Sequence, residues 1–387
     1  MIKNKLKIIV APDKFKHTFS AAEISTIIEN SILKNFNDIE VIKIPLSDGG
    51  EGFSDIIQTQ FNCEKRIISV CNPLFNNINA SYYFSKENKI GIIELSNASG
   101  LNLLKKKEQN PLKTTTFGTG LLIDNAIKSG AKKIILGLGG SATNDAGIGI
   151  ASALGFVFLN KFDEILNPIG ENLINITKII KPKTDELKDI KFEIAADVSN
   201  ILYGKNGAAH TFATQKGASK KDVIILDNGL KNFAEIIKNQ FNIDISKIAG
   251  GAAAGGVGAG LYALLNAEIN SGIELIMKSI DFENLIRNAD LIITGEGKID
   301  SQSVSGKVIS GVVKMGKNHS IPVTAIAGLI ELSEIELNRF GLINSKSLFK
   351  SKVSIEIAKE KSVELINKKT IEIITELRSK FLYLWSS

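Results

Sequence analysis

Glycine-rich segments carry most of the residues that could do chemistry, and three of these segments directly follow a predicted strand. One of them, GLGGSATNDAG, contains Gly139, Gly140, Ser141, Thr143 and Asn144. Backbone N–H groups at the start of a helix bind phosphate well, because they point at the anion and the helix dipole favours its charge. We therefore expect this segment to open a helix and to hold phosphate groups with its backbone, hydroxyl and amide donors.

Carboxylates follow two other predicted strands. Asp48 lies in PLSDGGEGF, where glycines let a ligand approach the backbone closely, although a tight turn with a solvated aspartate explains the same letters. Asp197 ends the strand predicted over 191–197, where a buried-looking strand reaches a loop. A carboxylate in that position suits a general base that takes a proton from an alcohol.

Acids and lysines crowd a further strand end, in ITGEGKIDSQSVSGKV. Glu296 and Asp300 are oxygen ligands of the kind that Mg²⁺ prefers, and Lys307 could meet a phosphate as a point charge. Near the N-terminus, Lys14 in APDKFK could bind a carboxylate or phosphate, with a lysine-rich surface turn as the alternative. Phosphate-binding backbone, lysines and carboxylates together indicate phosphoryl transfer, in which the protein positions groups and neutralises charge.

The composition excludes several classes of protein. The 387 residues are 44% hydrophobic and 23% charged, which are ordinary globular values, and no apolar run reaches the ~20 residues of a membrane span. Two cysteines and three histidines provide neither a disulfide framework nor a zinc module. The formal charge of +6 is mild and aromatic residues make up only 6%, so nucleic-acid binding is not indicated. We expect a cytoplasmic protein with a small anionic substrate.

Alternating strands and helices must position these residues. Near-continuous apolar runs predict strands over 7–12, 40–45, 89–95, 132–138, 191–197, 289–295 and 321–328. Such runs are typical of parallel strands covered on both faces, so the predicted fold class is α/β. Capping boxes at Ser20 and Ser219 predict two helix starts, and the segment 353–382 is typical of one or two amphipathic helices.

The glycine pattern is compatible with more than one ligand. A Walker-type GxxxxGK[ST] loop is absent. The letters GLGGSA, however, satisfy G-x-G-x-x-A, and Asp163 and Glu164 lie about twenty residues further on, as in a dinucleotide-binding loop. A nicotinamide-dependent oxidoreductase acting on a small hydroxy acid is therefore one alternative, and a non-catalytic anion-binding protein is another. The glycines of 250–261 predict a close approach of the backbone to a ligand or to another element.

Seven blocks of the sequence resemble bacterial glycerate kinases of the glycerate 2-kinase type. They are APDKFK, PLSDGGEG, TTTFGTG, GLGGSATNDAG, AADVSNILYGKNGAA, QKGAS and ITGEGKIDSQSVSGK, and they occur in the order seen in that family. The resemblance implies ATP-dependent phosphorylation of D-glycerate with Mg²⁺. The products would be ADP and a phosphoglycerate, with 2-phosphoglycerate favoured.

The resemblance also implies two α/β domains, one inserted into the other. The chain ends, 1–45 and 290–387, would form a Rossmann-like outer domain, and 46–289 would form the inserted Gly-rich domain. The active site would lie in the cleft between them. Whether the protein is a monomer or a homodimer stays open.

The resemblance also implies roles for individual residues at the positions that match the family's motifs. Asp197 and Asp48 would be catalytic, while Lys14, Ser47 and Lys307 would bind substrate. The GGSATN segment would bind the nucleotide, and the acids of ITGEGKID would serve the metal. Which carboxylate is the base and which serves the metal is left open. The chain departs from the family at Lys14 and Ser47, where small residues and alanine are usual, and in its lysine-rich C-terminal segment.

Overall fold

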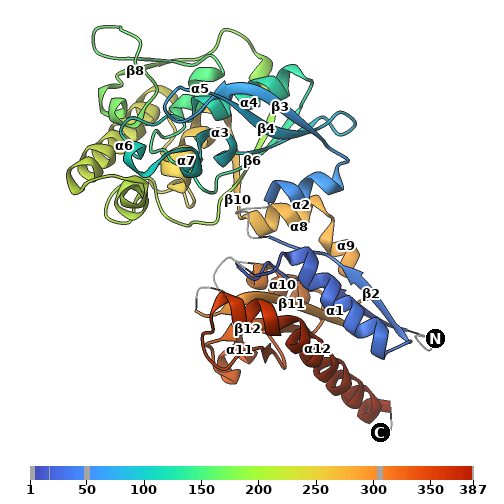
Figure 1. Cartoon of the computed structure of the whole chain (residues 1–387). Coiled ribbons are helices and arrows are strands. Elements are labelled where there is room, and N and C mark those ends of the chain that lie inside the picture. Colours follow the sequence, from blue (N-terminus) through green and yellow to red (C-terminus); the bar gives the residue numbers. More distant parts are fainter. Residues whose placement is uncertain (1–4, 17, 48–52, 302, 304–307, 386–387) are drawn as a thin grey trace. The chain divides into compact units, whose positions relative to one another are not determined.

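The computed structural model describes residues 5–16, 18–47, 53–301, 303 and 308–385, which fold into two compact units (Figure 1). Unit 1 comprises Met1–Asp48 and Ile276–Ser387, and unit 2 comprises Gly49–Leu275. Unit 1 is thus built from both ends of the chain. The segment 276–289, which the sequence prediction assigned to the inserted domain, belongs to unit 1.

Unit 1 has a five-stranded parallel sheet with the order β13-β12-β11-β1-β2. Its strands are β1 (Leu6–Val10), β2 (Ile39–Lys43), β11 (Leu291–Ile299), β12 (Val323–Ile330) and β13 (Lys346–Ser347). Its helices are α1 (Ala21–Asn35), α9 (Phe282–Ile286), α10 (Val308–Asn318), α11 (Glu334–Phe340) and α12 (Ile355–Trp385). The core of this unit packs strand residues such as Ile8 and Ile293 with Ile366 of α12.

The first helix of unit 1 begins at the predicted capping box. Ser20 Oγ accepts the Glu23 N–H at 3.2 Å, and the Glu23 carboxylate accepts the Ser20 N–H at 2.8 Å. Ile24, Ile28 and Ile32 then recur every four residues, and all three are fully buried. This spacing places them on one face of α1, so the same residues that form the helix also attach it to the core.

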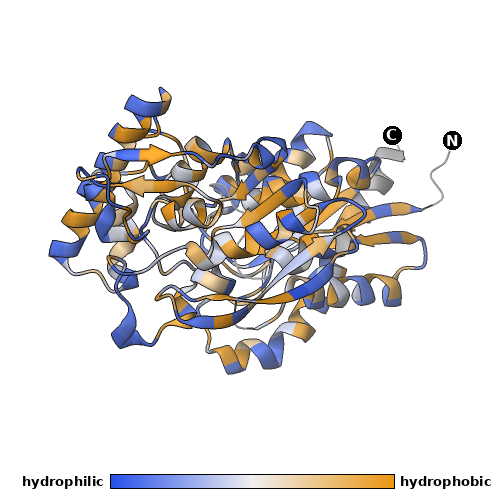
Figure 2. Ribbon diagram, turned by 90° about the horizontal axis from the view of Figure 1, so that it is seen from above, coloured by the Kyte–Doolittle hydropathy of each residue, from blue (hydrophilic) through white to orange (hydrophobic). Residues whose placement is uncertain are grey.

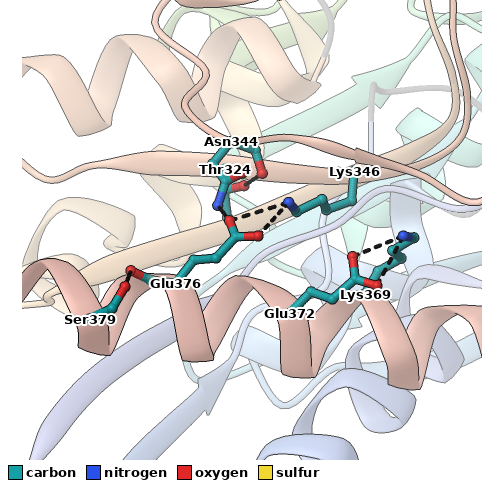
Figure 3. Close-up of polar contacts among 7 residues, drawn as sticks. All are labelled: Thr324, Asn344, Lys346, Lys369, Glu372, Glu376 and Ser379. Atoms are coloured by element: carbon teal, nitrogen blue, oxygen red, sulfur yellow. Dashed lines mark hydrogen bonds and ion pairs between the residues drawn. The ribbon is translucent and has the colours of Figure 1, made fainter.

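A polar contact attaches α12 to the segment around β13 (Figure 3). Glu376 accepts hydrogen bonds from Asn344 and from Lys346, whose Nζ lies 2.9 Å from Oε1. In the same view, Lys369 and Glu372 pair along the helix at 2.8 Å. The first contact joins two elements, whereas the second stays within α12. Pairs of the second kind stabilise a helix by only ~0.2–0.5 kcal/mol.

Unit 2 has a six-stranded mixed sheet with the order β10-β9-β6-β5-β4-β3. Its strands are β3 (Glu64–Cys71), β4 (Asn77–Ser85), β5 (Ile90–Glu94), β6 (Lys133–Gly137), β9 (Lys191–Ala195) and β10 (Glu268–Asn270). The strands β5, β6, β9 and β10 are parallel, whereas β4 pairs antiparallel with β3 and with β5. A separate antiparallel pair consists of β7 (Val157–Leu159) and β8 (Lys178–Ile180).

The α-helices that the structure describes in unit 2 are α2 (Phe53–Gln60), α3 (Ser96–Ser99), α4 (Phe117–Lys128), α5 (Ile148–Ala153), α6 (Lys220–Phe241) and α7 (Ala253–Leu265). A further helix, α8 (Gly272–Ser279), crosses the boundary to unit 1. The capping box predicted at Ser219 starts α6. Figure 2 shows hydrophilic and hydrophobic bands alternating along the helices. This pattern is typical of helices that cover a sheet on one side and face solvent on the other.

The observed elements confirm the α/β fold class, and all seven predicted strands are present with shifted ends. Two local predictions are wrong. No helix opens at the glycine turn after β6, because α5 begins only at Ile148, after Gly147 with φ +74°. The strand β11 continues to Ile299, so Glu296 lies within a strand and not in the predicted loop. Within the described part of the chain, no helix is both long and apolar enough to cross a membrane.

Candidate functional site

A hollow of about 400 Å³ opens in unit 2 where β6 and β9 end, and we call it the β6–β9 hollow. Its lining includes Gly139, Gly140, Ser141, Asp197 and Lys216. Ligands of parallel α/β sheets bind beyond the carboxyl ends of the strands, which is where this hollow lies. Four of the residues predicted from the sequence therefore meet in one place, although they come from segments more than fifty residues apart.

Asp197 lies two residues beyond the end of β9 and is exposed. Its Oδ1 accepts the N–H of Gly272, the first residue of α8, at 2.9 Å. Charge-assisted hydrogen bonds of this kind fix the orientation of a carboxylate. The side chain that was predicted as a base is therefore both held in place and accessible from the hollow.

Lys216 forms another part of the wall and is only 4% exposed. Its Nζ donates to Ser141 Oγ at 2.7 Å and to the Thr143 carbonyl at 2.8 Å. Burial lowers the pKa of this amine to about 7, while the nearby Asp145 carboxylate acts in the opposite direction. Lys216 therefore fixes the position of Ser141 and places a titratable amine in the wall of the hollow.

Thr143 and Asn144 lie deeper, with 0% and 1% of their surface exposed, and the lining of the hollow is formed by other described residues. Thr143 Oγ1 and both amide atoms of Asn144 have no hydrogen-bond partner among the described residues. A buried polar group left in this state costs ~1–3 kcal/mol. Such groups mark a place where an ordered water or a ligand group completes the hydrogen bonding.

Asp145 holds the turn between β6 and α5 together. It is fully buried and accepts hydrogen bonds from the N–H and hydroxyl of Thr116, both at 2.8 Å, and from the N–H groups of Gly147 and Gly149. Burial raises the pKa of this carboxyl, and these hydrogen bonds oppose the rise. Because its contacts reach the start of α5 and the start of α4, Asp145 fixes two elements behind the hollow.

The glycines of 250–261 form the other side of this turn. Gly255 has φ +73°, and a Cβ at this position would overlap the carbonyl oxygen of Thr143. The Gly255 carbonyl accepts the N–H of Ala146 at 3.1 Å. Ala253 and Ala254 belong to the lining of the hollow. These small residues thus let the chain pack closely against another element and also border the candidate site.

Three further candidates lie in unit 1, at adjoining points of its sheet. The Asp13 N–H donates to the Gly295 carbonyl at 2.8 Å, so Lys14 follows on a segment that runs beside β11, the strand that contains Glu296. The Leu46 N–H donates to the Pro12 carbonyl at 2.9 Å, so Ser47 follows close by. Ser47 is 3% exposed, and its hydroxyl has no hydrogen-bond partner among the described residues.

The remaining predicted site residues are Asp300, Asp48 and Lys307. Asp300 forms an ion pair with Lys298, whose Nζ lies 3.1 Å from Oδ2, and accepts the Ser303 N–H at 3.3 Å. Asp48 and Lys307 lie outside the described residues. Among the residues that the structure does describe, no group of three or more His, Cys, Asp or Glu side chains is arranged to hold a metal ion.

Lys216 is the functional candidate that the sequence prediction left out of the site. The available signal was its position in QKGAS, one of the seven blocks with a family resemblance. The letters alone do not show that this lysine is buried, because burial depends on the packing of the short 3₁₀-helix Thr214–Lys216 against the turn that contains Ser141.

The structure does not support the dinucleotide-binding hypothesis, because no helix begins at the glycines of the turn after β6. A dinucleotide-binding loop places its glycines where a helix begins. Here the first helix after Gly139 is the six-residue α5, which starts at Ile148. Glu164 is held by Asn160 in the turn between β7 and β8, where Asp163 has φ +61°. The acids that were matched to the ribose-binding position thus belong to an exposed turn.

Comparisons with known proteins cover nearly the whole chain. A model of the glycerate kinase family matches residues 8–378. The chain is 41% identical to the glycerate 2-kinase of Escherichia coli over 84% of this chain and 85% of that one. It is 42% identical to the glycerate kinase of Bacillus cereus over 91% and 93% of the two chains.

A solved structure is also similar. A provisionally assigned glycerate kinase 2 from Salmonella typhimurium LT2 matches with a TM-score of 0.86 and 36% sequence identity, covering 98% of this chain and 100% of that chain. The match therefore extends over the discontinuous unit 1 as well as over unit 2. Together with the family model and the curated relatives, it shows that the chain belongs to the glycerate kinase family, whose members are enzymes that phosphorylate glycerate.

Proposed function

We propose that this protein transfers the terminal phosphoryl group of ATP to D-glycerate and releases ADP and 2-phosphoglycerate. The family supports glycerate as the substrate, and the relative from Escherichia coli is a glycerate 2-kinase. The structural observation that supports phosphoryl transfer best is the β6–β9 hollow, where a glycine turn, a buried lysine and an oriented carboxylate meet.

The β6–β9 hollow is proposed to take the phosphates of ATP. Gly139 and Gly140 leave the backbone of the turn accessible, and Ser141 and Lys216 add donors at its wall. Thr143 and Asn144 remain candidates for the nucleotide site. Their buried polar atoms have no hydrogen-bond partner among the described residues, so a water or a ligand group is expected to bond to them. The proposed phosphate site is thus the turn itself and not a helix N-terminus.

Asp197 is proposed as the general base. A base in phosphoryl transfer accepts the proton of the attacking hydroxyl, and it must be accessible and correctly oriented. The hydrogen bond from Gly272 provides the orientation, and the exposure of Asp197 to the hollow provides the access. Asp48 is retained as the second catalytic candidate on the basis of the family resemblance.

Unit 1 is proposed to contribute residues that recognise glycerate. Lys14 and Lys307 offer positive charge to the carboxylate, and the Ser47 hydroxyl offers a hydrogen bond. The position of the carboxylate decides which hydroxyl is presented for reaction, and we propose that it is the 2-hydroxyl. Mg²⁺ is also proposed, since this ion is usually held by phosphates together with one or two carboxylates.

The residues fit Mg²⁺ only in part. Glu296 is 7% exposed within β11, and Asp300 is already engaged by Lys298, so Asp300 would have to exchange its partner to reach an ion. When bound, Mg²⁺ would neutralise charge on the phosphates. A cytoplasmic location is proposed because ATP is abundant there, and the free thiols of Cys63 and Cys71 agree with a reducing compartment.

A coupled assay of ADP release tests the proposal, with phosphorus NMR of the product to identify the phosphorylated hydroxyl. The Asp197→Asn variant should lose roughly 10²-fold or more in kcat while its KM for ATP stays close to normal, because a base acts in the transition state. Asp163→Asn is the matched control. It lies on an exposed turn whose positive φ suits asparagine, so its activity should be unchanged.

Three outcomes would contradict the proposal. Folded wild-type enzyme that releases no ADP with D-glycerate, ATP and Mg²⁺ would exclude the reaction. Near-normal turnover of Asp197→Asn would remove Asp197 from the base role. A thermal shift with NAD(H) but not with ATP would favour the oxidoreductase alternative instead.

A further inference from the structure

Lys216 is a buried amine that forms no ion pair among the described residues. Its side chain is 4% exposed, and the described residues place no carboxylate within ion-pair distance of its Nζ. Burying an ammonium group without a counter-ion is costly, because the charge loses its hydration. An arrangement of this kind persists in a binding site when a ligand provides the missing negative charge.

The hydrogen bonds of Lys216 leave a donor for such a ligand. A protonated amine has three N–H donors. Two are used, by Ser141 Oγ at 2.7 Å and by the Thr143 carbonyl at 2.8 Å. Both acceptors belong to the turn after β6, and Ser141 and Lys216 themselves belong to the lining of the β6–β9 hollow. The third donor is therefore available at the place where the phosphates of ATP are proposed to lie.

We propose that Lys216 binds the phosphates of ATP in the β6–β9 hollow and that it takes up a proton as they bind. This inference rests on the proposed function, since it assumes that ATP enters this hollow. The step is a proton transfer: an O–H bond of hydronium or an acid bond of a buffer molecule breaks, an N–H bond forms on Lys216, and the resulting ammonium donates a hydrogen bond to a phosphate oxygen.

The surroundings of the amine explain why it would titrate. Burial lowers its pKa to about 7, so the free protein holds both neutral and charged Lys216 near neutral pH. A phosphate oxygen beside Nζ favours the charged form and raises the pKa again. Binding is therefore linked to protonation, and the affinity for ATP should fall as the pH rises above 7.

Two carboxyl groups, on different elements, lie near Lys216 or its hollow. Asp145, in the turn after β6, favours the ammonium form. Asp197, beyond β9, belongs to the lining of the same hollow. His210, in the π-helix Ala209–Ala213 that precedes Lys216 in the chain, lies near Asp227 instead, with 3.9 Å between His210 Nε2 and Asp227 Oδ2. The α7 residues at the hollow are Ala253 and Ala254, which carry no charge.

Calorimetric titration of the full-length protein with MgATP tests the proton uptake. The measurement is made at pH 7 in two buffers with different ionisation enthalpies, which gives the number of protons taken up. Wild-type protein should take up measurably more protons than Lys216→Arg, because an arginine stays charged throughout this pH range. Equal uptake in the two proteins would overturn the proposal.

The affinity provides a second readout. Lys216→Met keeps an unbranched chain of similar bulk but removes the amine, so the Kd for MgATP should rise roughly tenfold or more. Lys220→Met, at the exposed start of α6, is the matched control and should leave the Kd unchanged. If Lys216→Met does not fold, the wild-type pH profile decides: a Kd that stays constant from pH 6.5 to 8.5 would contradict the inference.

A second probe separates this inference from the proposed function. Inorganic tripolyphosphate carries the charges of ATP without its nucleoside. If tripolyphosphate binds with Lys216-dependent proton uptake while MgATP does not bind, the anion site is supported and the use of ATP is wrong. If MgATP binds and turns over with no dependence on Lys216, the kinase proposal stands and the inference fails.

Discussion

The turn after β6 contains the buried Asp145 and is contacted by the buried Lys216. The two residues differ in how far the protein satisfies their hydrogen-bonding groups. Asp145 accepts hydrogen bonds from Thr116, Gly147 and Gly149. Lys216 has two hydrogen bonds and no ion-pair partner among the described residues. A fully satisfied buried group stabilises the fold, whereas a partly satisfied one is suited to a ligand.

Replacing Asp145 with asparagine should therefore destabilise the protein without touching the lining of the hollow. One carboxyl oxygen becomes an NH₂ group that faces N–H donors, so the hydrogen bonds that this oxygen accepts are lost. We expect the free energy of unfolding to fall by ~2–3 kcal/mol. Urea unfolding followed by circular dichroism measures this change.

The matched control is Asp124→Asn. Asp124 lies on α4 and pairs with Lys128 one turn later, at 2.7 Å, and the Lys128 side chain is 70% exposed. Surface pairs of this kind contribute ~0.5 kcal/mol or less. Equal losses in the two variants would show that the hydrogen bonds of Asp145 contribute no more than a surface contact.

At the scale of residues, the sequence predicts which side chains could take part in the reaction better than it predicts their burial and contacts. Gly139, Ser141 and Asp197 could be singled out because their residue types and their positions after predicted strands are visible in the letters. The hydrogen bond between Lys216 and Ser141 joins residues 75 positions apart. No local pattern contains such a contact, so a lysine in a surface-like QKGAS segment could not be recognised as buried.

At the scale of elements, the site depends on how closely α7 approaches the turn at 143–146. We expect Gly255→Ala to distort this turn, because the new Cβ would overlap the Thr143 carbonyl and the φ of +73° is also unfavourable for alanine. The loss in unfolding free energy should exceed that of a control glycine by ~2 kcal/mol or more. Chemical denaturation measures it, and MgATP affinity should fall in parallel.

Gly130→Ala provides the control for backbone strain alone. Gly130 has φ +102°, and a Cβ there would meet nothing within 4 Å. Its substitution should therefore cost only the conformational penalty of ~1–2 kcal/mol. If both variants lost the same stability, crowding at α7 would not be the reason for Gly255.

Elements whose signals are local were predicted, and those that depend on distant packing were not. The capping boxes of α1 and α6 lie within four residues, so the sequence alone locates both helix starts. The strands β3 and β4 escaped prediction because polar residues alternate along them, as in antiparallel strands with one open face. The late start of α5 follows from Asp145 and Gly255, which hold the preceding turn in a non-helical form.

At the scale of the molecule, each unit has a hydrophobic core of its own. Ile366 of α12 is fully buried in the core of unit 1, and Ile237 of α6 is fully buried in the core of unit 2. Substitution of either by valine removes one methylene and should cost ~0.5–1.5 kcal/mol. We expect Ile366→Val to speed hydrogen exchange mainly in unit 1, and Ile237→Val mainly in unit 2, as measured by mass spectrometry of peptides.

The paired variants make the test symmetrical, because the chemical change is the same in both. A uniform rise in exchange over the whole chain, from either substitution, would mean that the two units unfold together and would contradict the expectation.

The assembly of unit 1 from both chain ends has a consequence for synthesis on the ribosome. β1 and β2 leave the exit tunnel long before β11, which pairs with β1 and begins only at Leu291. Unit 2 can fold as soon as its continuous segment has emerged. The edge of β1 that pairs with β11 must therefore stay unpaired until residues 291–299 have emerged, which makes this part of the nascent polypeptide a natural client of a chaperone.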